Sequence, residues 1–441
     1  MNTPRDDDER HRLIRALADD GCLLCRDKDA AEHHWHTWYV METHRDPGYR
    51  RRIAAAGGFC ARHLRLLTTT SEGIRVLPSL LGDLIASALG GVTGCHCDPC
   101  DKMTAAVDRR LGALVRWLDD PEVINGIRRL CTHHLLDVLN TAPWPFATTL
   151  AAIARDQPYT PPSDPDLLIR APHLTAAAEL FAEDDKRLTE QSTTDRATHA
   201  LDLPCCPVCR ARSRGELRYA TWLLGQDVAR LDPGEPWLCP THLADATLLD
   251  HDSACTIWAT MHQAEHARLA QLADRLDASP LPGFFARLRA AWPHLLERRR
   301  DRAAAAFRRP ERFVAEALRN FRDNQPSCTA CAAGDLAERR ELALLDAASL
   351  HHTVRERWTR GHGLCRDHAA LAASDLAKDV LRSRLTLLGW ELEETQRKHA
   401  WHTRHEPATP AETSWPRAIP FLRGDACLGL APAEFDDQDT P

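Results

Sequence analysis

The sequence is poor in tyrosine, in lysine and in long apolar runs. It has only 4 tyrosines among 441 residues. The longest apolar stretch, Leu77 to Val92, is interrupted by Asp83 and by glycines, and it is shorter than the ~20 residues that a membrane-spanning helix needs. The first ten residues are acidic and polar, without the apolar run of a secretory signal. We therefore expect a cytoplasmic protein with no membrane partner.

Charge and composition narrow the fold class. The formal net charge is -7, which disfavours a general polyanion binder. The apolar fraction of 44% is that of a folded globular protein, and the length allows two or three domains. Long stretches rich in Ala, Leu, Arg and Glu favour helix, and segments typical of strands are scarce. The sequence therefore predicts an all-α, multi-helical fold.

Cysteine is abundant and regularly spaced. Sixteen cysteines in a chain without an export signal indicate metal or redox chemistry rather than disulfides. Four C-x2-C pairs alternate strictly with four C-x2-H pairs. In chain order they are Cys22 and Cys25, Cys60 and His63, Cys97 and Cys100, Cys131 and His134, Cys206 and Cys209, Cys239 and His242, Cys328 and Cys331, and Cys365 and His368.

The spacing between the pairs suggests repeated modules. The segments from each C-x2-C to the next C-x2-H are 34, 30, 29 and 33 residues long. A hairpin of two helices would bring the end of such a segment back to its start. We expect helices over Arg26–His44 and Arg210–Gln226, with turns at residues 46–48 and 232–234. The prediction is four helical hairpins, each closed by its own Cys3His knuckle.

Three thiolates and one imidazole form the closed tetrahedral ligand set that structural zinc prefers. The sequence therefore predicts four Zn2+ per chain, with an iron–sulfur cluster or redox thiols as the alternatives. Each pair lies where a helix is expected to begin, so the helix N-terminus can stabilise thiolate charge. We assign no role to the four remaining cysteines, which are Cys95, Cys205, Cys255 and Cys427.

Some of these motifs resemble a known family. Gly58-Phe59-Cys60-Ala61-Arg62-His63, Gly363-Leu364-Cys365-Arg366-Asp367-His368 and Cys206-Pro207-Val208-Cys209 are similar to the repeated C-P-x-C and G-F/L-C-x-x-H knuckles of uncharacterised bacterial and archaeal helical proteins. Only one C-x2-C pair has the proline, and Cys131 and Cys239 lack the preceding glycine. The resemblance implies a zinc-binding helical fold and no particular activity.

Proline-rich and charged segments suggest the domain boundaries. We expect a first helical half over residues 1–157, a proline-rich linker over 158–172 and a second half over 173–405. The second half contains an arginine-rich helical insert at 281–324, and residues 406–441 form a C-terminal tail.

Two other patterns suggest alternative functions. His262, Glu265 and His266 match the H-x2-E-H pattern of some zinc peptidases, but they lie along an apolar helical stripe and the chain lacks the strands of that fold. The arginines of the insert could contact phosphates, although Glu297, Asp301 and other acidic residues among them favour a solvated helix.

The functional hypothesis is a non-catalytic zinc-binding adaptor or protein-interaction module with an unidentified protein partner. A nucleic-acid-binding regulator that uses the insert is the first alternative. A thiol redox or zinc sensor is the second, and it requires at least one labile site.

Overall fold

The computed structural model describes residues 4–92, 96–157, 181, 192–227, 237–278, 316–321, 323–398, 402–403, 405–407, 409 and 414–424. Within these residues every regular element is a helix, which confirms the all-α class. The expected linker at 158–172, most of the insert at 281–324 and the tail after 424 lie outside the described residues.

The first half contains helices α1 to α9 and one short 3-10 helix. Their bounds are α1 Pro4–Ala18, α2 Leu23–Met41, η1 Thr43–Arg45, α3 Pro47–Ala55, α4 Ala61–Thr68, α5 Ser71–Leu89, α6 Asp98–Arg116, α7 Pro121–Ile127, α8 Thr132–Thr141 and α9 Trp144–Asp156. The expected helix at Arg26–His44 corresponds to α2. The expected turn at residues 46–48 instead begins α3, since Asp46 is its N-cap and accepts a hydrogen bond from the Gly48 amide.

The second half contains a similar succession of helices. Their bounds are α11 Thr193–Asp202, α12 Pro207–Leu224, α13 Pro240–Leu249, α14 His251–Ala278, α18 Thr329–Ala348, α19 His352–Arg360, α20 Arg366–Leu371, α21 Asp375–Lys398 and α22 Ser414–Arg423. The helix expected at Arg210–Gln226 corresponds to α12. The turn expected at residues 232–234 lies outside the described residues.

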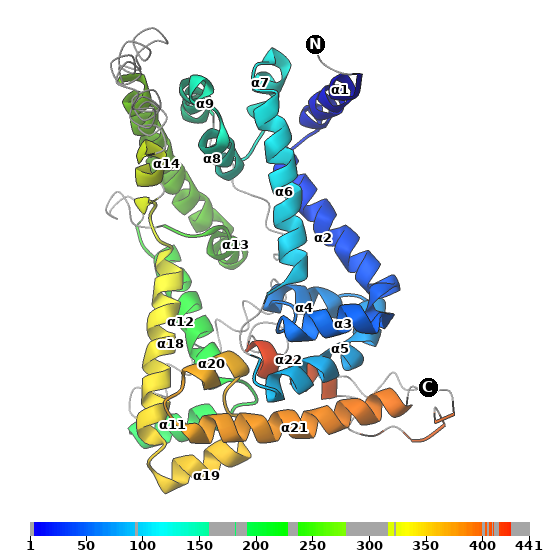
Figure 1. Cartoon of the computed structure of the whole chain (residues 1–441). Coiled ribbons are helices and arrows are strands. Elements are labelled where there is room, and N and C mark those ends of the chain that lie inside the picture. The colour runs from blue at the N-terminus through cyan, green and yellow to red at the C-terminus, as the bar shows by residue number, and fades with distance from the viewer. Residues whose placement is uncertain are drawn as a thin grey trace, which may run out of the picture.

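Two pairs of long helices organise the molecule. Figure 1 shows α2 beside α6 and α12 beside α18, with α5 and α21 lying together below them. Each long pair contains one helix from the start of its half and one from later in it. None of the helices over the described ranges combines the length and the apolar character needed to cross a bilayer.

The two largest apolar cores of the described residues contain residues of both halves. The largest buried cluster joins Trp35 and Leu77 of the first half to Trp358 and Leu392 of the second. A second cluster joins α1 and α6 to α9 with α14, for example through Leu272. Burial of apolar surface is the main favourable term in folding, so the two halves stabilise one another. The domain boundaries themselves stay a prediction.

Candidate metal centres

All sixteen predicted ligands lie in four groups that could hold a metal ion. Within each group the ligand atoms are within 4.8 Å of one another. We name them site A (Cys22, Cys25, Cys131, His134), site B (Cys60, His63, Cys97, Cys100), site C (Cys206, Cys209, Cys365, His368) and site D (Cys239, His242, Cys328, Cys331).

The pairing within these groups differs from the hairpin prediction. In each half the first C-x2-C pair meets the last C-x2-H pair, and the two inner pairs meet each other. Cys22 and Cys25 are thus completed by His134 and its neighbour Cys131, not by Cys60 and His63. The predicted closure of each hairpin by its own knuckle is wrong. The ligand pairs are nested, with the inner site enclosed by the outer one in sequence.

Helix length explains the nesting. Helix α2 has 19 residues and carries the chain about 28 Å from Cys22. Helix α3 has only 9 residues and spans about 13 Å, so it can bring the chain back by no more than that distance. Cys60 therefore returns only partway, to the level of Glu32, and cannot reach Cys22. Helix α6, running back along α2, carries the chain the remaining distance to site A.

Every ligand pair occupies the same position on a helix. The first cysteine is the N-cap, and the second ligand is three residues into the first turn; examples are Cys22 before α2, Cys60 before α4 and Cys365 before α20. N-cap and N3 residues lie on one side of the first turn, close to the free backbone amides. Each site is thus formed by two helix N-termini, whose partial positive charge stabilises thiolates.

The residues flanking each C-x2-H pair fix it in the core. Phe59, Leu130, Leu238 and Leu364 precede the four cysteines and are all buried. Gly58 precedes Phe59 with a φ of +91°, and a Cβ there would lie 2.6 Å from Leu84 Cδ2. Only glycine fits this turn, which directs Phe59 into the core and Cys60 toward site B. Gly363, with a φ of +80°, has the corresponding position before Cys365 of site C.

The distances between ligand atoms are close to those of tetrahedral zinc coordination. Ideal tetrahedral zinc with standard bond lengths separates two sulfurs by about 3.8 Å and a sulfur from a nitrogen by about 3.6 Å. The Sγ–Sγ distance is 3.8 Å for Cys25 and Cys131 in site A and 4.0 Å for Cys239 and Cys331 in site D. Across the four sites the distances from Sγ to the histidine Nδ1 run from 3.1 to 3.5 Å. The four residues of each group therefore fit a zinc-sized ion.

Carboxylates contact the outer nitrogen of three ligand histidines. His63 Nε2 lies 2.9 Å from Glu32 Oε1, and both side chains are largely buried. His242 Nε2 lies 3.6 Å from Glu216 Oε2, and His368 Nε2 lies 3.6 Å from Glu338 Oε1. Such carboxylates orient the imidazole so that Nδ1 faces the ion. At site A, an oxygen of Asp137 lies within 4.8 Å of a His134 ring nitrogen.

These carboxylates were missed from the sequence although their spacing repeats. Glu32, Glu216 and Glu338 each follow the second cysteine of a C-x2-C pair by seven residues, which is two helical turns. The fourth pair has Val107 at this position. A search for acidic residues at constant offset from each pair would have found them.

The thiols and the imidazole of a site shift one another's pKa values. Burial lowers the pKa of His63, but interactions with Cys100, Cys60 and Glu32 outweigh it and raise that pKa to about 11. In site D the pKa of Cys328 falls to about 3, chiefly through its contact with Cys239, with His242 contributing and burial opposing. Contact between thiol and imidazole thus favours thiolate beside imidazolium in sites B and D.

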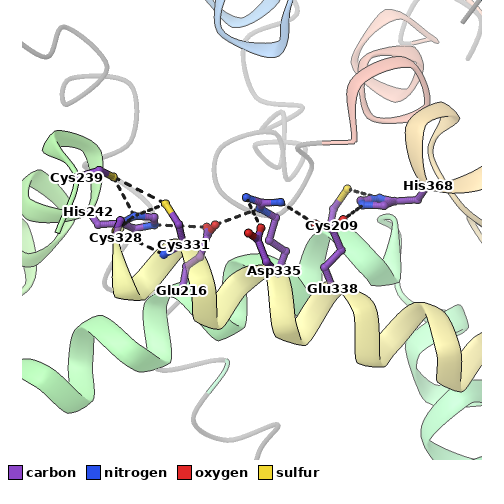
Figure 2. Close-up of polar contacts among 10 residues, drawn as sticks. Cys209, Glu216, Cys239, His242, Cys328, Cys331, Asp335, Glu338 and His368 are labelled. Atoms are coloured by element: carbon purple, nitrogen blue, oxygen red, sulfur yellow. Dashed lines mark hydrogen bonds and ion pairs between the residues drawn. The ribbon is translucent and has the colours of Figure 1, made fainter. Parts of the chain in front are cut away.

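Sites C and D are connected by a cluster of charged side chains. Figure 2 shows Glu216, Asp335 and Glu338 between the two groups of ligands. The guanidinium of Arg212 donates from Nε to Glu216 Oε1 at 3.1 Å and from Nη1 to Glu338 Oε2 at 2.7 Å, and its Nη2 lies 3.0 Å from Asp335 Oδ1. One side chain of α12 therefore contacts the carboxylates behind both ligand histidines.

Between sites A and B the corresponding space is open. A cavity of about 730 Å³ is lined by ligands of both sites, by Met103, Val107 and Leu111 of α6, and by Lys28 of α2. Lys28 occupies the position of Arg212, three residues after the second cysteine. In the first half the guanidinium beside Glu32 comes instead from Arg62 of α4, whose Nη2 lies 2.8 Å from Glu32 Oε2.

The remaining described candidates are not members of these four groups. Glu265 is buried and paired with Arg268 at 2.6 Å. Over the part of the chain described, the groups able to hold a metal do not include His262, Glu265 and His266. Nor do they include Cys205, which is buried, or Cys255, which is exposed. Cys95 and Cys427 are outside the described residues.

Comparison with known proteins gives no relative, since no family model matches the chain and no curated protein or solved structure is significantly similar to it. The function proposed below rests on the geometry of the four sites.

Proposed function

We propose that this chain is a non-catalytic zinc protein in which four structural Zn2+ ions hold a helical scaffold for protein interaction. The main support for this proposal is the set of four Cys3His groups, each formed by two helix N-termini and each with tetrahedral spacing. Zinc fits this donor set better than harder cations do, because thiolate is a soft ligand.

A structural role is supported by the closed ligand shell. A catalytic zinc keeps one position for water or substrate, whereas each group here supplies four protein ligands. Most of the ligands are buried, and Cys131, Cys206 and Cys365 are at most 1% exposed. Each ion would join segments far apart in the chain, such as those of Cys206 and Cys365.

A protein-binding role is supported by exposed apolar side chains on the scaffold. Trp390 is 68% exposed and Leu387, one turn before it on the same face of α21, is 45% exposed. Exposed aromatic anchors of this kind are enriched where proteins associate. The buried face of α21 packs on α5, so the helix is held rigidly for such contact.

The metal proposal is tested by elemental analysis of protein purified without added metal. We expect close to four zinc ions per chain and no absorption near 400 nm. A brown preparation that contains iron and sulfide would replace zinc by iron–sulfur clusters. The adaptor proposal is tested by affinity purification of the wild type beside Trp390→Ala, where a specific protein partner should be lost from the variant.

A zinc or redox sensor is a second candidate because site D is the most exposed of the four. Cys239, Cys328 and Cys331 are all partly exposed, whereas all four ligands of site A are buried. Exposed thiolates react fastest with peroxide. If the chain is a sensor, mild peroxide should release about one zinc, from site D first. The nucleic-acid alternative depends on the insert, and nothing in the described residues favours it.

A further inference from the structure

Arg212 lies between two metal sites that share no ligand. Its three carboxylate partners come from both long helices, Glu216 from α12 and Asp335 and Glu338 from α18. The two glutamates divide their oxygens in the same way. Each gives one oxygen to Arg212 and turns the other toward a ligand histidine. A continuous chain of contacts therefore runs from His242 through Glu216, Arg212 and Glu338 to His368. Figure 2 shows the two glutamates between the two histidines.

The contacts cross between the sites. Helix α12 supplies Cys206 and Cys209 to site C, but its Glu216 contacts the histidine of site D. Helix α18 supplies Cys328 and Cys331 to site D, but its Glu338 contacts the histidine of site C. The orientation of each ligand histidine thus depends on the helix that the other ion holds. Glu216 and Glu338 have side chains only 15% and 19% exposed, so water does not readily take over these contacts.

The first half provides an internal comparison. Lys28 replaces Arg212, Thr104 replaces Asp335 and Val107 replaces Glu338 at the same offsets from the C-x2-C pairs. An ammonium is a point charge and cannot hold several carboxylates in fixed directions as a planar guanidinium does. Glu32 of α2 contacts His63 across the pair and accepts from Arg62 at 2.8 Å. Arg62 and His63 line the cavity between sites A and B.

We infer that Arg212 couples sites C and D, so that the second half binds and releases its two zinc ions as a pair. This inference rests on the proposed zinc binding. Loading of site C fixes His368, and thereby Glu338, Arg212 and Glu216 in the positions that orient His242 for site D. By linkage the effect is equal in the other direction. Couplings of this kind change affinity by about 5-fold to 150-fold.

The test measures zinc protection of individual cysteines in the full-length protein. Zinc-loaded protein is equilibrated with increasing chelator and pulsed with N-ethylmaleimide, and mass spectrometry of peptides gives the half-point for each cysteine. Cys239 and Cys331 report site D. The quantity of interest is the shift of the site D half-point caused by Cys365→Ser, which disables site C.

We expect Cys365→Ser to lower the site D half-point at least fivefold in the wild-type background and less than twofold in Arg212→Met. Arg212→Lys, which recreates the first half, should behave like Arg212→Met while it retains the charge. Arg50→Met is the control, since it removes an ion pair between α3 and α5, with Asp83, that lies at no metal site; there the fivefold shift should persist.

The inference is overturned if the shift persists in both Arg212 variants, because coupling would then pass through the fold alone. It is also overturned if no shift occurs in the wild-type background, or if Arg50→Met abolishes the shift. A different result would remove the zinc proposal itself: alkylation of the site C and D cysteines in the untreated protein before any chelator is added.

Discussion

Single residues at the four sites divide into those that the sequence shows directly and those that need the fold. The ligands are visible because the C-x2-C and C-x2-H spacings are local, set by N-cap and N3 on one helical turn. Glu32 acts across two helices. Its offset from Cys25 marks it in the sequence, but nothing near His63 identifies that histidine as its partner. The pairing of Glu32 with His63 depends on the packing of α2 against α4, which only the structure shows.

Glu32 provides the first test at this scale. Replacing it by Gln keeps the shape but removes the negative charge that orients His63 and increases its basicity. We expect zinc affinity at site B to fall about 10-fold to 100-fold, since second-sphere carboxylates typically contribute this much. Competition with a chromophoric chelator measures it. Glu72→Gln, an exposed change on α5, is the control and should leave the affinity unaltered.

The protonation of His63 predicts the pH dependence of zinc binding. With its pKa raised to about 11 in the metal-free protein, His63 carries a proton at neutral pH that zinc must displace. Affinity at site B should therefore increase as pH rises, from 6.5 through 7.5 to 8.5. Chelator competition at these three values checks the direction. An affinity that is constant or falls with pH would show that no proton is displaced.

At the scale of helices, the sequence predicts the starts of elements better than their partners. Alternating ligand pairs with similar spacers are compatible both with a series of closed hairpins and with a nested arrangement. What decides between the two arrangements is the difference in length between the expected 19-residue helix at Arg26–His44 and the shorter helix that follows it before Cys60. The sequence gives both segment lengths, but the comparison holds only if both helices are straight.

Helix α22 shows how an element distant in sequence completes two sites. Arg423 at its end donates to the carbonyls of Gly57 and Phe59, in the turn that leads to Cys60 of site B. The next residue, Gly424, has a φ of +78°, and a Cβ there would lie 2.6 Å from Cys209 Sγ and 3.0 Å from Cys365 Sγ. Site C is therefore covered by this glycine.

Gly424→Ala should disturb site C selectively. The new methyl group would displace the two sulfurs, and the left-handed backbone adds about 1 to 2 kcal/mol of strain for a residue with a Cβ. We expect Cys209 and Cys365 to become alkylated at lower chelator concentration. Gly91→Ala is the matched control, because Gly91 has a φ of +88° with nothing within 4 Å of its Cβ position. Equal effects of the two changes would mean that backbone strain alone is responsible.

At the scale of the molecule, the metal sites and the apolar cores are interdependent. The largest core draws on both halves, so loss of the ions in one half should loosen the other as well. The sequence did not show this packing, because a proline-rich segment between two similar halves favours independent domains. Contacts between α5 and α21 have no local signature.

Removal of all metal should therefore unfold the protein cooperatively. Zinc binding in small modules contributes on the order of 10 to 16 kcal/mol, as much as the ~5 to 15 kcal/mol that keeps a typical domain folded. We expect excess chelator to abolish most of the far-ultraviolet circular dichroism signal of helix in a single transition. New protease sites should appear in both halves. A chelated protein with unchanged helix content and melting temperature would contradict a structural role for the ions.

The nested pairing of ligands is the central claim, and cysteine alkylation of Cys60→Ser tests it most directly. Site B loses one ligand in this variant, so Cys97 and Cys100 should become reactive toward N-ethylmaleimide, while Cys22, Cys25 and Cys131 of site A stay protected. Cys131→Ser is the reciprocal variant and should expose Cys22 and Cys25 while sparing Cys97. The opposite pattern, with Cys22 and Cys25 exposed by Cys60→Ser and Cys97 and Cys100 protected, would contradict the nested arrangement and restore the closed hairpins.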